Sequence, residues 1–324
     1  MARNPENWLG QELAAGRYKV TAKLGEGGMG FIYKAHDGNL DTDVVIKVPR
    51  LSMLVERQFA QRFTRELRSL VNLSHPHIVK IIDVGQQDKI PFAVMQYLSG
   101  GDLADRLQDG RVSPDSLSAW LPEIAGALDF VHEEGYVHRD IKPGNILFDK
   151  QGHAYLSDFG VAKVVSEEAD SKQSQGLTGT GMVIGTQGYM PLEMLLGQSV
   201  DGRADQFALA VVVYEALSGS RPFAGDTAAE CAISMNTTTP VPLYEVDAGI
   251  PLALSRTVQR GLSTQPQERF DRCELFSGQV LAAASGETTS TTNSSSQRRA
   301  SFSRTQYSPA ASSGTPSSPA GVMK

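Results

Sequence analysis

The sequence has few of the features that mark extracellular or membrane proteins. Only two of its 324 residues are cysteine, and Cys231 and Cys273 are too few and too far apart for a disulfide framework or a zinc site. Residues 1–10 show no signal-peptide pattern. The longest apolar run, residues 207–216, contains Glu215 and is too short to span a bilayer. We therefore expect a cytoplasmic protein without a membrane span.

Basic residues are fewer than acidic residues in this chain. The chain has 30 Lys and Arg residues against 36 Asp and Glu residues, which gives a formal net charge of −6. A mildly acidic chain has little general attraction for nucleic acids or anionic lipids, so we expect no nucleic-acid partner. Apolar residues make up 40% of the chain, which is enough for a sizeable core.

The end of the chain lacks apolar periodicity. Ser, Thr, Gly, Pro and Ala dominate residues 285–324, and such a segment buries too little apolar surface to offset its conformational entropy. We expect a disordered tail there. Ser301, which follows two arginines, is a candidate phosphosite, and an unmodified solubilising tail is the alternative.

Regular structure is predicted for most of the remaining chain. Phe59, Phe63, Leu67 and Leu70 recur at helical spacing between two groups of strand patterns. We therefore predict a five-stranded antiparallel sheet with one helix after its third strand, ending near residue 98. The expected strands are residues 17–24, 31–35, 43–48, 78–84 and 90–95. Further helices are expected over residues 103–107 and 117–133 and from Asp205 to residue 217, and a hairpin over residues 146–148 and 153–156.

Gly25, Gly27 and Gly30 occupy the G-x-G-x-x-G positions between the first two expected strands. Since a strand follows them, and a dinucleotide-binding turn needs a helix there, we interpret the segment as a flap. Glycines let the backbone of such a flap approach phosphates closely. An ordinary hairpin turn is the alternative for this loop alone.

Lys47 lies among β-branched residues in the third expected strand. A lysine in a buried strand needs an anion, whereas one on an edge strand faces water. Glu66 lies beside the apolar stripe of the following helix and is the candidate partner; a solvated position is the alternative for this glutamate.

The residue types that phosphoryl transfer needs are concentrated in residues 138–145. Asp140 supplies a carboxylate that can act as a base, and Lys142 supplies a positive charge for the transferred phosphate. Asn145 and Asp158, the latter in an Asp-Phe-Gly sequence, are oxygen ligands suited to magnesium. Together these groups predict a phosphotransferase active site.

These motifs resemble those of the eukaryotic-type Ser/Thr protein kinases, in the style of the bacterial members. The resemblance covers residues 17–284. It implies an α+β fold with two lobes, in which residues 17–98 form an N-lobe with a five-stranded antiparallel sheet and one helix, and residues 99–284 form a mainly helical C-lobe. Residues 1–16 are then an N-terminal extension.

The resemblance also implies which residues bind the nucleotide and perform the transfer. ATP is the expected cofactor, with magnesium or manganese. The residues implied to bind ATP are Leu24, Gly25, Glu26, Gly27, Gly28, Met29, Gly30, Ile32, Lys47, Met95, Gln96, Leu98 and Asp102. The implied catalytic residues are Asp140, Lys142, Lys47 and Glu66, and the implied metal ligands are Asn145 and Asp158.

Residues 161–188 resemble an activation segment. Thr178 and Thr180 are the candidate regulatory phosphosites, because a phosphate there could pair with Arg139. Thr186 matches the threonine that lines the acceptor-hydroxyl pocket of Ser/Thr kinases. Loop composition alone is the alternative explanation for any single phosphosite.

The segment after the activation segment departs from the family pattern. The usual Ala-Pro-Glu is replaced by residues 191–193, with the proline one position early at Pro191. We expect Glu193 to pair with Arg269 and Asp205 to form hydrogen bonds with the catalytic loop. Because the proline comes one position early, the family pattern does not define the backbone conformation of this segment or of the substrate-side pocket.

The predicted function is transfer of the γ-phosphate of ATP to Ser and Thr hydroxyls of protein substrates. We also expect autophosphorylation of the activation segment, through self-association if it occurs in trans. A pseudokinase scaffold is one alternative, although such proteins normally lack a key group that this chain retains. A small-molecule kinase is the other, although it is not expected to carry Lys142, Thr186 and Glu193 together.

Overall fold

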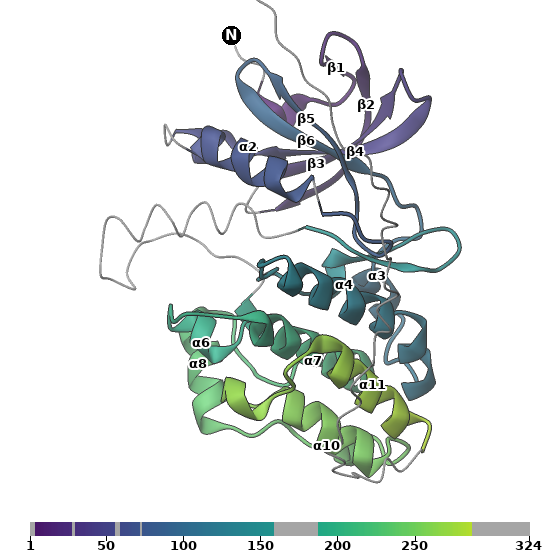
Figure 1. The fold of residues 1–324 in the computed structure, drawn as a ribbon, viewed down its shortest axis with the longest axis vertical. Helices are drawn as coiled ribbons and strands as arrows, with labels where there is room; N and C mark the ends of the chain where they lie inside the picture. The colour runs from purple at the N-terminus through teal and green to yellow at the C-terminus, as the bar shows by residue number, and fades with distance from the viewer. Residues whose placement is uncertain (1–3, 28–29, 56–58, 72, 159–186, 287–324) are drawn as a thin grey trace, which may run out of the picture. The chain divides into compact units, whose positions relative to one another are not determined.

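A computed structural model describes residues 4–27, 30–55, 59–71, 73–158 and 187–286. Its first part is an antiparallel sheet with one long helix beside it, and helices make up most of the remainder (Figure 1). The strands are β1 Glu12–Leu13, β2 Tyr18–Gly27, β3 Gly30–Asp37, β4 Thr42–Pro49, β5 Ile81–Gln87 and β6 Ile90–Gln96, in the spatial order β1-β2-β3-β4-β6-β5.

The sheet has one strand more than the five that the sequence predicted. The additional strand, β1, comes from the segment interpreted as an extension and pairs with β2. Trp8 and Leu13 from this segment are fully buried, and the Tyr33 hydroxyl donates a 2.6 Å hydrogen bond to the Pro5 carbonyl. A two-residue strand is too short to show an alternating pattern, so the sequence carried no signal for it.

The segment expected as a strand over residues 78–84 also differs. Strand β5 begins at Ile81. Ile78 instead forms an isolated bridge with Leu156, and the Val79 amide donates to the Leu156 carbonyl at 2.9 Å. The residues before β5 therefore connect the sheet to a hairpin of the helical part, a long-range pairing that a local pattern does not reveal.

Successive side chains of a strand point to opposite sides of the sheet. Both faces of this sheet carry buried apolar side chains. One face, which includes Phe31 and Val48, packs beneath Trp8. The opposite face, which includes Met95, packs against α2 (Phe59–Leu70), as the predicted apolar stripe requires. Lys47 precedes Val48 in β4 and therefore lies on the α2 face.

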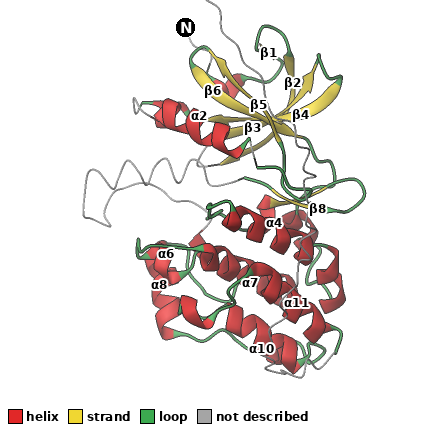
Figure 2. Ribbon diagram, viewed as in Figure 1, coloured by secondary structure: helices red, strands yellow, loops and turns green. Residues whose placement is uncertain are grey.

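The helical part contains one two-stranded sheet, formed by β7 (Ile146–Phe148) and β8 (Ala154–Leu156), which Figure 2 shows beside α4. Its described helices are α3 Leu103–Leu107, α4 Leu121–Glu133, α6 Leu192–Leu195, α7 Gly202–Ser218, α8 Ala228–Thr237, α9 Leu243–Val246, α10 Leu252–Gly261 and α11 Cys273–Ala284. A short α1, Leu51–Leu54, follows β4. The 3₁₀ segments are Pro5–Asn7, Pro114–Ala119, Pro143–Asn145, Gln187–Tyr189 and Pro266–Glu268.

Two predicted helix starts are wrong. The expected helix over residues 117–133 is divided, because Pro122 is confined to the first turn of α4 and the preceding residues form a 3₁₀ segment. Helix α7 begins at Gly202, three residues before Asp205, since the Asp201 side chain caps it by accepting from the Arg203 amide at 2.9 Å. Asp205 is thus a buried residue of the first turn.

Helix α7 runs through the centre of the helical core and is buried on nearly every side. Its exposed end is Gly219, which adopts a left-handed conformation with φ 78° as glycine commonly does after a helix. Among the described residues, none of the helices is both long enough and apolar enough to cross a membrane.

Candidate active site

The loop with the predicted catalytic residues lies between α4 and β7, where two hydrogen bonds from its backbone fix it to α7. The amides of His138 and Arg139 donate to Asp205 Oδ2 and Oδ1 at 2.7 and 2.8 Å. Arg139 adopts a left-handed conformation with φ 64°, which costs about 1–3 kcal/mol in a non-glycine residue. The two hydrogen bonds to the buried carboxylate offset this strain, as the sequence-based role of Asp205 anticipates.

Asp140, Lys142 and Asn145 converge on one point. Lys142 Nζ donates to Asp140 Oδ2 at 3.0 Å, and Asn145 Nδ2 donates to the same oxygen at 3.0 Å and to the Asp140 carbonyl at 2.6 Å. Both contacts use the amide nitrogen of Asn145, so its Oδ1 oxygen takes no part in the contact with Asp140. Asp140 is 7% exposed, so its carboxylate is fixed by donors rather than by water.

His138 connects this loop to the residue before Asp158. Burial lowers the pKa of His138 and favours the neutral ring. Its Nε2 lies 2.9 Å from the Ser157 carbonyl and its Nδ1 lies 3.3 Å from the Asp140 amide. Since a carbonyl only accepts and an amide only donates, Nε2 carries the proton.

Asp158 joins the helical part to the sheet. Its Oδ1 lies 2.8 Å from Lys47 Nζ, and its backbone has a left-handed φ of 59°. The predicted partner of Lys47, Glu66, lies on α2, but its side chain lies outside the described residues. The structure therefore brings together Lys47 and Asp158, which are separated by more than a hundred positions in the sequence.

The backbone of the predicted glycine loop is open at two of its glycines. A Cβ placed on Gly25 or Gly27 would meet no described atom within 4 Å. In contrast, a Cβ on Gly30 would overlap the backbone carbonyl of Val48, because β3 approaches β4 closely there. Leu24 is largely exposed and Ile32 is half-buried.

The end of β6 and the connection after it contain the other residues implied to bind ATP. Met95 is buried against the α2 face of the sheet. The Gln96 amide donates to the Lys80 carbonyl at 2.9 Å. Among the described residues, the half-buried Leu98 has no acceptor for its amide. The Asp102 side chain caps α3, accepting from the Asp105 amide at 2.8 Å.

Several of the predicted site residues cannot be placed. Those that lie outside the described residues are Gly28, Met29, Thr178, Thr180, Thr186 and Ser301. The roles assigned to them stay predictions, as does the disorder expected for residues 285–324, of which residues 287–324 lie outside the described residues.

A groove of about 380 Å³ opens beside Lys142. Its lining includes Tyr189, whose hydroxyl donates to Glu215 Oε2 at 2.7 Å. Burial and this hydrogen bond raise the pKa of Tyr189. The sequence reasoning assigned no function to either residue, although a glutamate within the apolar run of α7 was a signal. The groove lies next to the catalytic loop and is therefore the candidate site for the acceptor substrate.

Glu193, in α6, and Arg269 form a buried ion pair. The guanidinium donates to both carboxylate oxygens, at 2.7 and 2.9 Å, and also to the Ser263 carbonyl at 2.7 Å. Pro191 is the residue immediately before α6, with φ −72° and ψ 160°. The early proline is therefore accommodated without a cis bond or an interrupted helix.

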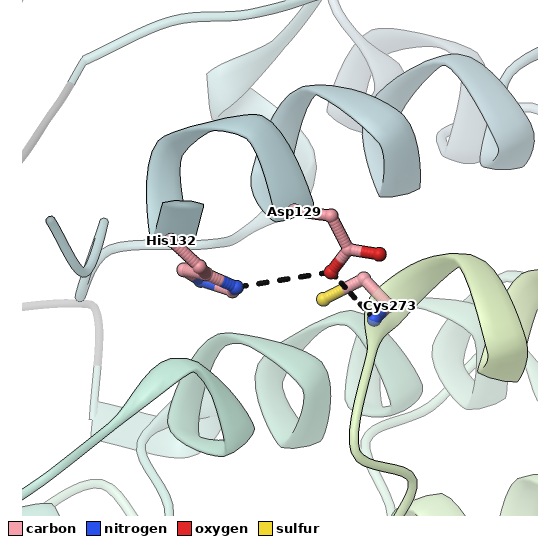
Figure 3. Close-up of side chains that lie close together, drawn as sticks. All are labelled: Asp129, His132 and Cys273. Atoms are coloured by element: carbon pink, nitrogen blue, oxygen red, sulfur yellow. Dashed lines mark hydrogen bonds and ion pairs between the residues drawn. The ribbon is translucent and has the colours of Figure 1, made fainter. Parts of the chain in front are cut away.

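Asp129, His132 and Cys273 lie close together beneath the site, with potential ligand atoms within 4.8 Å of one another (Figure 3). Asp129 already accepts from the amides of Cys273 and Glu274 at 2.8 and 3.0 Å, and thereby caps α11. His132 Nε2 lies 2.8 Å from Asp205 Oδ2. Since the carboxylate and the imidazole are committed to these contacts, we interpret the cluster as structural and assign no metal to it.

The position of His132 between two carboxylates predicts a pH-dependent stability. Burial alone would lower the pKa of His132, but Asp129 and Asp205 outweigh it and raise the pKa from 6.5 to about 9. The folded state therefore holds a proton that the unfolded chain releases near pH 6.5. The stabilisation, up to about 3 kcal/mol, is complete below that pH and is lost as the pH rises through about 9.

Urea unfolding of the wild type and of His132→Gln between pH 6 and pH 9.5 measures this effect. The difference between their unfolding free energies is expected to shrink as the pH rises, because the variant has no group to titrate. The comparison cancels the ionisation of the two buried thiols, whose pKa values burial raises. A constant difference across this range would contradict the prediction.

Comparison with known proteins identifies the same family that the sequence motifs resemble. A family model described as "Protein kinase domain" matches residues 18–279. The serine/threonine-protein kinase PksC of Streptomyces coelicolor is 34% identical over 287 residues, a match that covers 86% of this chain and 51% of that protein. The serine/threonine-protein kinase PknB of Mycobacterium leprae is 33% identical over 276 residues, which cover 84% of this chain and 43% of that protein. The chain thus spans about half the length of the curated relatives it matches.

Solved structures show the same similarity. The PknI kinase domain of Mycobacterium tuberculosis matches with a TM-score of 0.64 and 27% sequence identity, over 84% of this chain and 97% of that one. This likeness confirms the two-lobed α+β fold that the sequence predicted, with a sheet in the N-lobe and helices in the C-lobe.

Proposed function

Because this chain belongs to the protein kinase family, we propose that it transfers the γ-phosphate of ATP to Ser and Thr side chains of protein substrates. The observation that carries the proposal is the convergence of Lys142 and Asn145 on the carboxylate of Asp140. The names of relatives that are 33–34% identical, all serine/threonine-protein kinases, support the choice of acceptor.

Each group has a defined part in the proposed reaction. Asp140 orients the acceptor hydroxyl and receives its proton as the oxygen attacks phosphorus. Lys142 lies within 3.0 Å of that carboxylate and offsets the negative charge that accumulates on the transferred phosphate. Lys47 holds the α- and β-phosphates from the sheet side.

Kinases of this family use ATP with a divalent cation. We assign Mg²⁺, with Mn²⁺ as a substitute, to Asn145 and Asp158. The donor set fits a hard cation, because both residues offer oxygen and Asn145 keeps its amide nitrogen on Asp140. The cation would neutralise phosphate charge in the transition state.

Regulation is proposed on the same basis. Phosphates on Thr178 and Thr180 would pair with Arg139, whose backbone Asp205 already fixes. Self-association would allow one copy to phosphorylate another, and Ser301 is a further candidate site. Thr186 would line the acceptor pocket. The proposed boundaries are residues 17–284 for the kinase domain and 285–324 for the tail, in a cytoplasmic protein with access to ATP.

Incubation of the purified chain with labelled ATP, Mg²⁺ and a generic protein substrate tests the proposal. Phosphoserine and phosphothreonine are expected in the substrate, and mass spectrometry identifies them and any phosphate on the chain itself. The Asp140→Asn chain, prepared in the same way, controls for contaminating kinases. Equal incorporation by both chains, or none by the wild type after preincubation with ATP, would overturn the proposal.

A further inference from the structure

Arg50, immediately after β4, makes a contact that the catalytic scheme does not use. Its Nε donates to the Gly27 carbonyl at 2.9 Å, and its Nη2 donates to Glu26 Oε1 at 2.6 Å. Lys23 approaches the same carboxylate from β2 and donates to Glu26 Oε2 at 2.6 Å. Glu26, near the end of β2, is thus held by a cation from its own strand and by a cation that follows β4.

The two cations that hold Glu26 lie over one aromatic ring. Arg50 and Lys23 each lie 5.0 Å from the centroid of the Phe31 ring. Phe31 faces Glu26 across the β2–β3 pair and faces Val48 across the β3–β4 pair. Arg50 therefore reaches over β3 to β2, on the face that packs beneath Trp8.

This face is opposite to the one that carries Lys47. The side chain of Lys47 lies on the α2 face and reaches Asp158, whereas Arg50 contacts the outer edge of the glycine loop. Among the described residues, Arg50 contacts the glycine loop at the Gly27 carbonyl and the Glu26 carboxylate. Any influence of Arg50 on a nucleotide would therefore act through the backbone that it holds.

The charge arrangement keeps the contact ionised. Hydrogen bonds from Lys23 and Arg50 lower the pKa of Glu26. Because all three side chains are about a third or more exposed, the ion pairs alone contribute little to folding. The hydrogen bond from Arg50 to a main-chain carbonyl is different, because it fixes backbone that must approach phosphates.

We propose that Arg50 is a positioning residue for the triphosphate of ATP. It lies three positions after Lys47, just beyond the end of β4, and bonds directly to Gly27, so it sets the separation between two elements expected to contact phosphates. This inference rests on the proposed function, since it assumes that ATP occupies the space beside Gly25 and Gly27.

Two adenosine ligands, one with a triphosphate and one without phosphates, provide the test. The dissociation constants of MgATP and of adenosine are measured by titration calorimetry for the wild type and for Arg50→Gln. MgATP is expected to bind about fivefold more weakly to the variant, which corresponds to about 1 kcal/mol, the typical net contribution of one hydrogen bond. Adenosine, which has no phosphates, is expected to bind with less than about a twofold change.

Two further variants show that the effect belongs to this contact. Glu26→Gln removes the carboxylate but leaves the Gly27 carbonyl, so we expect a smaller loss of MgATP affinity than for Arg50→Gln. Arg203→Gln removes an arginine from an exposed 2.8 Å ion pair with Asp271 in the C-lobe. It is the matched control and is expected to bind both ligands as the wild type does.

The outcomes separate the two claims. Equal weakening of MgATP and adenosine by Arg50→Gln would mean a general structural role and would overturn the positioning role, as would unchanged affinity for MgATP. A wild type that binds no MgATP would overturn the proposed function, and with it the role of Arg50. A KM for ATP that rises while the KM for the protein substrate stays constant would support the positioning role.

Discussion

Asp140→Asn is expected to lower kcat by about a thousandfold, within the range that general acid–base groups contribute. Asparagine fills the same space but cannot take the proton of the acceptor hydroxyl at neutral pH. It also replaces one oxygen of a carboxylate that now accepts from both Lys142 and Asn145. Initial rates of phosphate transfer at saturating ATP and substrate measure the effect.

The binding of MgATP separates a chemical defect from a folding defect in this variant. Asp140 is assigned to the acceptor hydroxyl, so the dissociation constant of MgATP is expected to change by less than about threefold. A variant that binds MgATP normally and retains a tenth of the wild-type kcat would show that Asp140 is not the base. Loss of both binding and activity would instead show that the carboxylate supports the fold of the loop.

Glu193→Gln is expected to lower the free energy of unfolding by about 3–5 kcal/mol. The Arg269 side chain is fully buried, and Glu193 supplies its only charged partner among the described residues. Glutamine leaves a desolvated guanidinium with neutral acceptors only, namely the carbonyls of Ser263, Arg203 and Thr264 and the new amide. Urea denaturation monitored by tryptophan fluorescence measures the loss.

An exposed pair of the same chemistry serves as the control. Asp271 lies 2.8 Å from Arg203 but is 79% exposed, so Asp271→Asn is expected to cost no more than about 1 kcal/mol. The double variant Glu193→Leu with Arg269→Met is expected to be more stable than Glu193→Gln alone, because no unpaired charge remains buried. A loss for Glu193→Gln as small as that for Asp271→Asn would contradict the prediction.

Sequence patterns predicted those parts of the fold that depend on local periodicity. The apolar spacing from Phe59 to Leu70 gave α2 with its buried face, and α3 occupies the residues predicted for it. Strand β1 was missed because two residues show no period, and its stability comes from pairing with β2 and from Trp8 nearby. The start of α7 was missed because Asp201 is a cap that precedes the apolar residues.

Residue type and motif order identified part of the candidate site before the structure was considered. Asp140, Lys142 and Asn145 were identified together, and the structure brings them within hydrogen-bonding distance. The contacts of Arg272 with Asp129 and of Tyr189 with Glu215 were not anticipated. The first contact joins residues 143 positions apart and the second joins residues 26 positions apart. No local sequence pattern marks either contact, because tertiary packing decides which polar side chains meet.

The bonds around Asp129 and Asp205 have a consequence for how the protein is made. Asp205 holds the catalytic loop, His132 joins Asp205 to Asp129, and Asp129 caps α11 through the amides of Cys273 and Glu274. A nascent chain still on the ribosome, with residue 273 not yet emerged, lacks the last of these partners. Since chains emerge from the N-terminus, we expect the catalytic loop to reach its final conformation only once residues 273 and 274 have emerged, well after the whole six-stranded sheet.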